Sequence, residues 1–333
     1  MDDSYDKRKS LRTIVVSVKE LSRTIKHVSS HMADKKLVDF LVEKVVLAEL
    51  MNVPTHGLHY FIHCLYPLLL ENNINHGKIS IERASVYCDG TGGIGFLKLD
   101  EVLDVASELA VKYGIAVALI KDPGKVGALR VYCEKYMNNN QLVMIFKNTA
   151  RTVGIQSTKE PIIGTNPICI GLPGTNFIYD SSISTVATNK VRLAEKYGYC
   201  FPNSIGVSKD MELTGQPEKI TATEGFLLPF SYGPFWYKSF HLGVVIEALA
   251  AFAGGKTGRR VGEHKGKRLY SKEGLFALVV DGSVTPVYKE YIEEINQILS
   301  EITDYGIRIP NDYEGSKENI EVLKDDWEEL INL

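Results

Sequence analysis

Residues 147–173, KNTARTVGIQSTKEPIIGTNPICIGLP, join two apolar runs and decide how the middle of the chain is interpreted. The run that ends here, QLVMIFK (141–147), and the run that begins here, ICIGL (168–172), are short and apolar, as buried strands are. Between them stands Gly164-Thr165-Asn166-Pro167, and Asn before Pro is typical of a turn. The stretch therefore predicts two strands joined by a structured loop.

Alternating strands and helices extend outward from this stretch, over residues 79 to about 180. The sequence predicts strands at Ile79–Tyr87 and 115–121 (IAVALIK), and a late strand in 275–282 (LFALVVDG). Helices are predicted at Leu99–Tyr113, Leu129–Met137, Ile183–Tyr197 and Leu242–Phe252. Residues 198–225 are rich in turn residues and are predicted to be mostly loop.

Both ends of the chain show helical periodicity. Three helices are expected at the start, at Leu11–Val28, Lys36–Leu50 and Leu58–Glu71, and the third is expected to be kinked or broken at Pro67. Two amphipathic helices, Tyr288–Ile302 and Lys317–Ile331, are expected at the other end. This order of elements predicts an α/β or α+β protein with helical ends.

Composition excludes several classes of function. The 333 residues include 44% hydrophobic and 24% charged residues, with a formal net charge of −3, so neither nucleic acid nor an anionic membrane is expected as a partner. Apolar runs are shorter than the roughly 20 residues of a membrane span, and the first ten residues do not resemble a signal peptide. Five widely spaced cysteines indicate reduced thiols and a cytoplasmic location.

Two glycine-rich segments resemble nucleotide-binding motifs. CDGTGGIGF (88–96) spells G-x-G-x-x-G through Gly90, Gly92 and Gly95, but three helices precede it and the acidic residue after the next strand, Asp122, comes late. GGKTGRR (254–260) has Ala250 where a Walker A loop needs glycine, and it follows a helix rather than a strand. We therefore expect a tight turn at the first segment and no phosphate loop at the second.

Several other segments, taken in order, carry a family resemblance. They are Thr55-His56-Gly57, 114–134 (GIAVALIKDPGKVGALRVYCE), the stretch 147–173 with its full Gly-Thr-Asn-Pro, 179–185 (YDSSIST) and 227–255 (LLPFSYGPFWYKSFHLGVVIEALAAFAGG). Together they resemble the type-2 malate/L-lactate dehydrogenase family over nearly the whole chain. No single motif identifies the family, but several segments that match in the same order and with similar spacing do.

The resemblance implies an NAD- or NADP-dependent oxidoreductase that interconverts a small-molecule 2-oxo acid, or a cyclic imino acid, and its reduced form. It also implies a mostly antiparallel mixed sheet flanked by helices, which is not a Rossmann fold. Residues 79–285 would form the α/β cofactor-binding domain, and residues 1–78 with 286–333 a helical domain. Such proteins are usually homodimers, so a homodimer is expected.

The resemblance also supplies candidate site residues. His56 and Lys125 are the catalytic candidates, and Thr55, Tyr60 and Arg130 are the substrate-binding candidates. The cofactor-binding candidates are Asn148, Gly164, Thr165, Asn166, Asp180, Ser182 and Lys238. Tyr60 stands where the family has an arginine that grips the substrate carboxylate, and Lys125 stands where the family has a second histidine. A lysine supplies positive field for a developing alkoxide, whereas tyrosine offers no charge to a carboxylate.

Structural alternatives stand beside these assignments. His56 alone would be a satisfied histidine at a helix start, and Asp180 and Ser182 would be helix caps. His59 and His63 follow His56 at helical spacing and suggest a metal site, but no carboxylate nearby in the sequence completes one, so no metal is expected. The loss of the arginine and of the second histidine leaves a second hypothesis, a degenerate family member that keeps the fold, and nucleotide affinity with it, without turnover.

Overall fold

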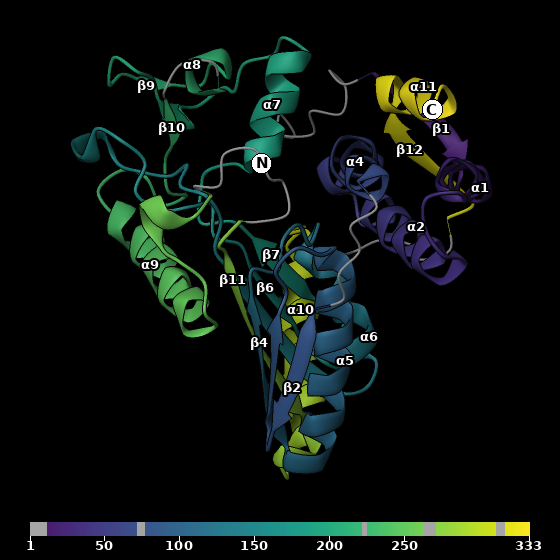
Figure 1. The fold of residues 1–333 in the computed structure, drawn as a ribbon. Helices are drawn as coiled ribbons and strands as arrows, with labels where there is room; N and C mark the ends of the chain where they lie inside the picture. The colour runs from purple at the N-terminus through teal and green to yellow at the C-terminus, as the bar shows by residue number, and fades with distance from the viewer. Residues whose placement is uncertain (1–11, 72–76, 222–224, 263–270, 311–316) are drawn as a thin grey trace.

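The computed structural model describes residues 12–71, 77–221, 225–262, 271–310 and 317–333. Its centre is a seven-stranded sheet with the strand order β2-β3-β4-β11-β5-β6-β7 (Figure 1). The strands are β2 (Lys78–Glu82), β3 (Ser85–Asp89), β4 (Ile115–Lys121), β5 (Gln141–Lys147), β6 (Ile168–Gly171), β7 (Ile178–Ser181) and β11 (Gly274–Asp281). Only β3 and β4 pair in parallel, and the other neighbours are antiparallel. The expected mostly antiparallel mixed sheet is confirmed, and the sheet is not a Rossmann sheet.

The middle of this sheet follows from three apolar runs with period-two burial. Ala118 of β4 lies opposite Ala277 of β11, which in turn lies opposite Ile145 of β5. These three side chains are fully buried. Small residues in β4 and β11 admit helix α5 (Gly95–Tyr113) on one face, while α9 (Trp236–Phe252) packs against β11 and β5 on the other (Figure 1). The result is a helix–sheet–helix sandwich.

The glycine-rich segment forms the start of α5 and the turn before it. The strand β3, the turn, α5 and the parallel strand β4 make one β-α-β unit inside an otherwise antiparallel sheet. A side chain at Gly95 would lie 2.3 Å from the carbonyl oxygen of Lys125. The glycine thus lets the helix start pack against the loop that follows β4, which accounts for the motif without a bound pyrophosphate.

The two ends of the chain meet in a small sheet that the sequence analysis missed. Strand β1 (Thr13–Ser17) pairs antiparallel with β12 (Asn319–Leu323), so the predicted helices Leu11–Val28 and Lys317–Ile331 were wrong over their first residues. The run TIVVS favours a strand because its β-branched residues pack well on a pleated surface. Helix α1 (Val18–Ser29) begins only after Ser17, whose side chain accepts a hydrogen bond from the Glu20 amide. Leu11 lies outside the described residues.

Other helices differ from expectation mainly at their bounds. α2 (Lys35–Leu50) and α11 (Lys324–Ile331) are regular, whereas the third helix is divided into α3 (Leu58–Tyr60), a π-helical turn η4 (Phe61–Leu65) and α4 (Tyr66–Leu70). The interruption comes directly before Pro67, as expected for a residue without an amide hydrogen. The predicted helix 129–137 begins as the 3-10 turn η5 (Leu129–Tyr132) and continues as α6 (Cys133–Met137).

Two predicted elements were wrong in part. The predicted helix 183–197 is helical only at α7 (Thr188–Lys196), because Ile183 and Thr185 donate their amides to Thr165 and Leu228. The predicted strand 79–87 is the hairpin of β2 and β3, which turns at Arg83 with a φ of 52°.

The remaining described elements are short or peripheral. The expected loop 198–225 holds α8 (Glu218–Thr221) and two strands of a small sheet, β8 (Gly206–Val207) and β9 (Leu213–Thr214), which β10 (Phe226–Leu227) completes. The short helices are η3 (Pro54–His56), η6 (Gln156–Thr158), η7 (Gly258–Arg260) and η8 (Gly282–Val284). Among the described residues, no helix is long and apolar enough to cross a membrane.

Helix α10 (Tyr288–Asp304) lies against the sheet part of the molecule rather than against the terminal helices. The Tyr291 hydroxyl donates to the carbonyl of Pro173, and the Asn296 amide donates to the carbonyl of Gly174. The division into a helical domain (1–78 with 286–333) and an α/β domain (79–285) therefore stays a prediction.

The sheet that joins the chain ends should contribute measurably to stability. Val322 on β12 is fully buried, while Val15 on β1 is 62% exposed. We expect Val322→Ala to lower the free energy of unfolding by about 2 kcal/mol, because two buried methyl groups are lost. Val15→Ala, the matched control, should cost less than about 0.5 kcal/mol. Urea unfolding measures both, and equal effects would contradict the placement of β12 in the core.

Candidate active site

A large cavity of about 1240 Å³ contains most of the candidate site residues. Its lining includes eight of them: Thr55, His56, Tyr60, Lys125, Arg130, Thr165, Asp180 and Ser182. They come from four segments, namely η3 with α3, the loop after β4 with η5, the loop before β6, and β7 with the residue after it. The fold thus brings together catalytic, substrate-binding and cofactor-binding candidates that are far apart in the sequence.

His56 lies at the end of η3, a short helical turn that begins with Pro54. Its Nδ1 is 2.9 Å from the hydroxyl oxygen of the buried Thr55. The ring of Tyr60 stacks on the imidazole with 5.6 Å between centroids and a 20° angle between planes. Two neighbours therefore fix the orientation of the imidazole, and with Nδ1 held by Thr55, Nε2 is the nitrogen left for chemistry.

The electrostatic surroundings of His56 favour the neutral ring. Burial lowers the pKa of His56 from 6.5 to about 4, and the positive charges of Lys190, Lys125 and Arg130 act in the same direction. Near neutral pH the imidazole is therefore unprotonated in the ligand-free protein. A neutral imidazole has a nitrogen lone pair, so His56 can accept a proton from a bound ligand.

Arg130 and Asp180 form an ion pair at the cavity wall. The Nε of Arg130 donates to Asp180 Oδ2 at 3.2 Å, and the backbone amide of Arg130 donates to the same oxygen at 3.3 Å. Burial raises the pKa of Asp180, although Arg130 opposes the shift. Part of the guanidinium predicted to bind substrate is therefore used to hold its own orientation.

Two further cations line the cavity beside this pair. Lys125 is exposed on the loop after β4, and Lys190 lies on α7. Burial and the charge of Arg130 both lower the pKa of Lys190. The sequence analysis missed Lys190, because a lysine in a polar helix gives no signal until the fold turns it toward the cavity. The wall formed by Lys125, Arg130 and Lys190 attracts anions.

The floor of the cavity contains a buried ion pair between Lys147, at the end of β5, and Glu273, just before β11. The Lys147 ammonium also donates to the carbonyl of Asn148 at 3.2 Å. Burial lowers the pKa of Lys147, and the nearby Glu273 carboxylate opposes the shift. Sequence analysis missed this pair because Lys147 ends an apolar strand and Glu273 is 126 residues away.

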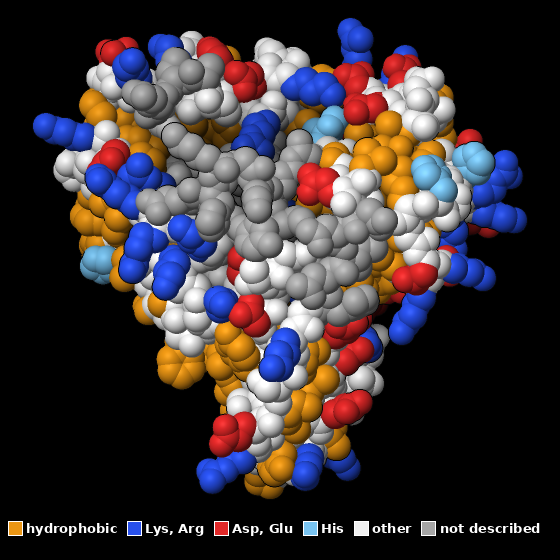
Figure 2. Space-filling view, in the orientation of Figure 1, with side chains coloured by type: hydrophobic (Ala, Val, Ile, Leu, Met, Phe, Trp, Pro, Cys, Tyr) orange, Lys and Arg blue, Asp and Glu red, His pale blue; other side chains and the backbone are white. Residues whose placement is uncertain are grey.

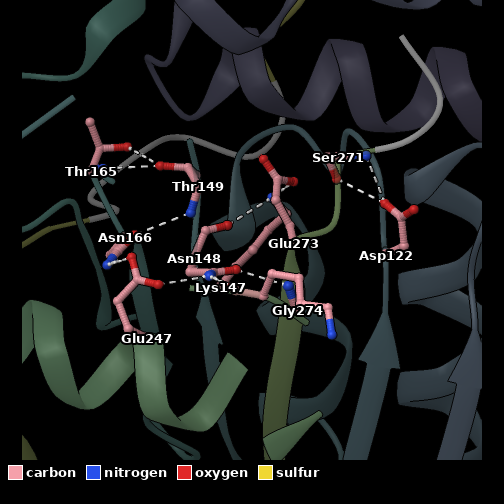
Figure 3. A network of polar contacts seen from close by, with 11 residues as sticks. Asp122, Lys147, Asn148, Thr149, Thr165, Asn166, Glu247, Ser271, Glu273 and Gly274 are labelled. Carbon is pink, nitrogen blue, oxygen red and sulfur yellow. Dashed lines mark hydrogen bonds and ion pairs between the residues drawn. The ribbon is translucent and has the colours of Figure 1, made fainter. Parts of the chain in front are cut away.

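Below the cavity, the carboxylate of Glu247 organises the segment 147–173 (Figure 3). Its two oxygens accept hydrogen bonds from the side-chain amides of Asn148 and Asn166 and from the backbone amides of Gly164 and Gly258. Asn148 Oδ1 in turn accepts from the Gly274 amide at 2.8 Å. Glu247 was missed, although a lone acid in the apolar run LGVVIEALAAF was the available signal.

Asn148, Gly164 and Asn166 therefore act in the framework of the site and are absent from the cavity lining. A side chain at Gly164 would lie 2.3 Å from the carbonyl oxygen of Thr149, so only glycine fits there. Lys238, at the start of α9, lies over the Phe235 ring with 5.1 Å to its centroid, also away from the lining. Direct cofactor contact by these four residues stays a prediction.

Hydroxyl groups also line the cavity. Thr165 and Thr149 share a hydrogen bond at 3.2 Å, and Ser182 and Ser184 share one at 2.9 Å. All four residues line the cavity. A cavity lined by both hydroxyls and cations is suited to a ligand that carries both anionic groups and polar neutral groups.

Comparisons with known proteins agree on one family. A family model of malate/L-lactate dehydrogenases matches residues 16–319. The L-sulfolactate dehydrogenase of Methanocaldococcus jannaschii is 27% identical over 279 residues, which is 80% of this chain and 79% of that protein. The (2R)-3-sulfolactate dehydrogenase (NADP(+)) of Chromohalobacter salexigens is 25% identical over 243 residues, 70% of this chain and 69% of that protein.

A solved structure has the same fold. The crystal structure of a dehydrogenase from Sinorhizobium meliloti superposes with a TM-score of 0.83 at 22% identity, covering 97% of this chain and 98% of that one. At this identity the likeness concerns the fold, so the expected fold class is supported by a second, independent observation.

The lowered pKa of His56 has a consequence for stability. Between its unfolded pKa of 6.5 and its folded pKa of about 4, the unfolded chain binds a proton that the folded protein does not. Stability is therefore lost as the pH falls through this window. We expect His56→Gln to reduce the loss of unfolding free energy between about pH 7 and about pH 4.5.

Urea unfolding at the two pH values measures this effect. His27→Gln, at an exposed position on α1, is the matched control and should keep the wild-type loss. An equal loss in wild type and His56→Gln would contradict the buried, neutral imidazole.

Proposed function

Because the chain belongs to the malate/L-lactate dehydrogenase family and is an oxidoreductase, we propose that it interconverts a 2-oxo acid and its 2-hydroxy acid, using NAD or NADP. The observation that carries the proposal is the neutral His56 imidazole facing Lys125, Arg130 and Lys190 in one cavity. Such a site combines a proton acceptor with positive field for a carboxylate and a developing alkoxide.

The donor set of the cavity fits a nicotinamide dinucleotide. The volume of about 1240 Å³ exceeds that of ordinary small-molecule pockets. Arg192 of α7 would hold a phosphate group, and the hydroxyls of Thr165, Ser182 and Ser184 would hold polar groups of the cofactor. When bound, the nicotinamide accepts the hydride from the 2-hydroxy acid or donates it to the 2-oxo acid.

His56 manages the proton in this proposal. In the tautomer that carries its proton on Nδ1, beside the Thr55 hydroxyl, Nε2 accepts the hydroxyl proton of the 2-hydroxy acid during oxidation. In the reverse direction His56 must carry a proton, and the negative charge of a bound 2-oxo acid favours it by raising the pKa of the imidazole. Lys125, where the family has a histidine, supplies positive field to the alkoxide rather than a second proton relay.

Recognition of the substrate carboxylate differs from the family pattern. Burial raises the pKa of Tyr60 well above 10.0, so this side chain is a neutral phenol. Arg130 is partly engaged by Asp180. Lys190 and Lys125 therefore provide most of the charge that a carboxylate requires, as point charges rather than as a bidentate fork. Weaker orientation of the carboxylate is the expected consequence.

A cytoplasmic location forms part of the proposal. The five cysteines of the chain lie in described parts of the structure, and none of them forms a disulfide there. The buried Cys133 and Cys169 have sulfur atoms 3.4 Å apart, which share a hydrogen bond and no disulfide. Thiols in this arrangement suit a reducing compartment.

A homodimer is proposed from the exposed side of α9. This 17-residue helix buries only five residues, while Tyr237, Val244, Val245 and Phe252 stay exposed. Figure 2 shows hydrophobic side chains along the edge of the molecule where α9 lies. Exposed large apolar residues gathered on one helix mark an interaction surface, and a second copy of the chain is the partner that the family resemblance implies.

Cofactor binding followed by turnover tests the proposed activity. We expect NADH or NADPH to bind, measured by nicotinamide fluorescence, and to be oxidised when oxaloacetate, pyruvate or sulfopyruvate is added. His56→Gln should lower kcat about 100-fold because the proton relay is lost, with cofactor affinity unchanged. Lys190→Ala should raise KM, whereas Lys112→Ala, at an exposed position on α5, should change neither constant.

Two outcomes would count against this assignment. Binding of a cofactor without oxidation by any acid supports the degenerate member that keeps the fold without turnover. If neither cofactor binds at millimolar concentration, the proposed use of the cavity is wrong.

The oligomeric state is tested by light scattering after size exclusion. We expect twice the chain mass of 37.1 kDa for wild type and a monomer for the double variant Val245→Glu with Phe252→Glu, because two charges would enter an apolar interface. Ile331→Glu, at an exposed apolar position on α11, is the control. A monomeric wild type at micromolar concentration contradicts the dimer.

A further inference from the structure

A cluster of possible metal ligands lies outside the cavity lining, where the two chain ends meet. It consists of His59 on α3, His63 in the π-helical turn η4, and Asp326 on α11. One ligand atom of each lies within 4.8 Å of the other two. No metal was expected from the sequence, because no carboxylate stands near the two histidines. The fold supplies that carboxylate from 263 residues away.

The spacing between the ligand atoms suits a tetrahedral ion. His59 Nδ1 lies 3.2 Å from Asp326 Oδ1, and His63 Nε2 lies 3.4 Å from the same oxygen. In a tetrahedral zinc site with metal–ligand distances of about 2.0–2.1 Å, neighbouring ligand atoms are about 3.3 Å apart. The two observed separations match this edge, and the two histidine ligand atoms lie within 4.8 Å of each other, so a shift of one imidazole would close the third edge around an ion.

The chemistry of the ligands points to the same class of ion. Two imidazole nitrogens and one carboxylate oxygen are a donor set that Zn²⁺ prefers over Mg²⁺ or Ca²⁺, which take oxygen ligands. Asp326 is fully buried, whereas His63 is partly exposed and gives an ion access from solvent. The negative charge of a buried carboxylate is costly unless it is paired, and a metal cation between the carboxylate and the two imidazoles would neutralise it.

The groups around the cluster leave room for a fourth ligand. Glu329 lies one turn further along α11, with Oε2 3.9 Å from His63 Nε2. The nearest cation is Lys196 of α7, whose Nζ is 3.9 Å from Asp326 Oδ1 and 3.7 Å from Asp325 Oδ2. Lys196 is 40% exposed, so it can remain with Asp325 when an ion occupies the cluster.

We propose that His59, His63 and Asp326 bind one divalent transition-metal ion of the zinc class, with Glu329 or water as the fourth ligand. Such an ion would fasten the C-terminal helix to the segment that carries His56 and Tyr60. Its role is structural, because the cluster does not line the cavity. Failure of this proposal would leave the proposed oxidoreductase activity untouched.

Calorimetric titration of the chelator-treated full chain with Zn²⁺ is the first test. We expect one equivalent to bind to wild type, and His63→Gln to bind it at least about tenfold more weakly. His63→Gln is suitable because a partly exposed histidine can be replaced without loss of the fold. His31→Gln, at an exposed position after α1, is the matched control and should bind Zn²⁺ as wild type does.

Two further measurements separate this cluster from binding to a cysteine. Bound Co²⁺ should give the strong visible absorption of a tetrahedral site in wild type and in Cys200→Ser, but not in His63→Gln. Zn²⁺ should raise the Tm of wild type and leave that of His63→Gln unchanged, since an ion stabilises the state that binds it. Absence of Zn²⁺ uptake by wild type, or equal affinity in wild type and His63→Gln, would overturn the proposal.

Discussion

The buried carboxylate of Glu247 is the interaction on which the rest of the site depends. It accepts hydrogen bonds from four donors in three segments, so it holds the residue after β5, the loop before β6 and the start of η7 in one fixed arrangement around α9. A charge without partners in this position would be costly, and each donor removed would leave the carboxylate less well satisfied. The Gly-Thr-Asn-Pro turn is therefore defined by a contact that lies below the cavity, and the residues that face the ligand take their positions from it.

The cavity holds its cations and its neutral imidazole on different elements of the fold. Its cations come from the loop after β4, from η5 and from α7, while the neutral His56 comes from η3 near the start of the chain. Burial is the main reason that the pKa of His56 is low, and the positive charges that would attract an anionic substrate lower this pKa further. Binding of an anion in the cavity would therefore raise the pKa of His56, because its negative charge offsets the positive charge of the cations. These cations make the cavity suited to anions, although Tyr60, at the position where the family resemblance predicts an arginine, carries no charge.

The sequence predicted the parts of the fold that have a local signal. The three central strands β4, β5 and β11 were predicted because each is a continuous apolar run that is too short for a typical helix and has the length of a buried strand. Pro67 marked the interruption of the third helix for a local reason as well. In contrast, β1 and β12 pair across about 300 residues of chain, and no pattern within either segment indicates such a partner. The same limit applied to the site, since Lys190, Glu273 and Asp326 become functional candidates only when the fold places them beside their partners.

The meeting of the chain ends has a consequence for the cavity wall that carries His56. The segment Thr55–Tyr60 is contacted on one side by α7, which supplies Lys190, and is continuous with α3, which packs against β12 and α11. Its position relative to the cations therefore depends on contacts made by the last residues of the chain. The cluster of His59, His63 and Asp326 lies on this path. A change in the C-terminal helix should therefore shift the backbone that carries His56, because α3 begins two residues after His56 and packs against α11.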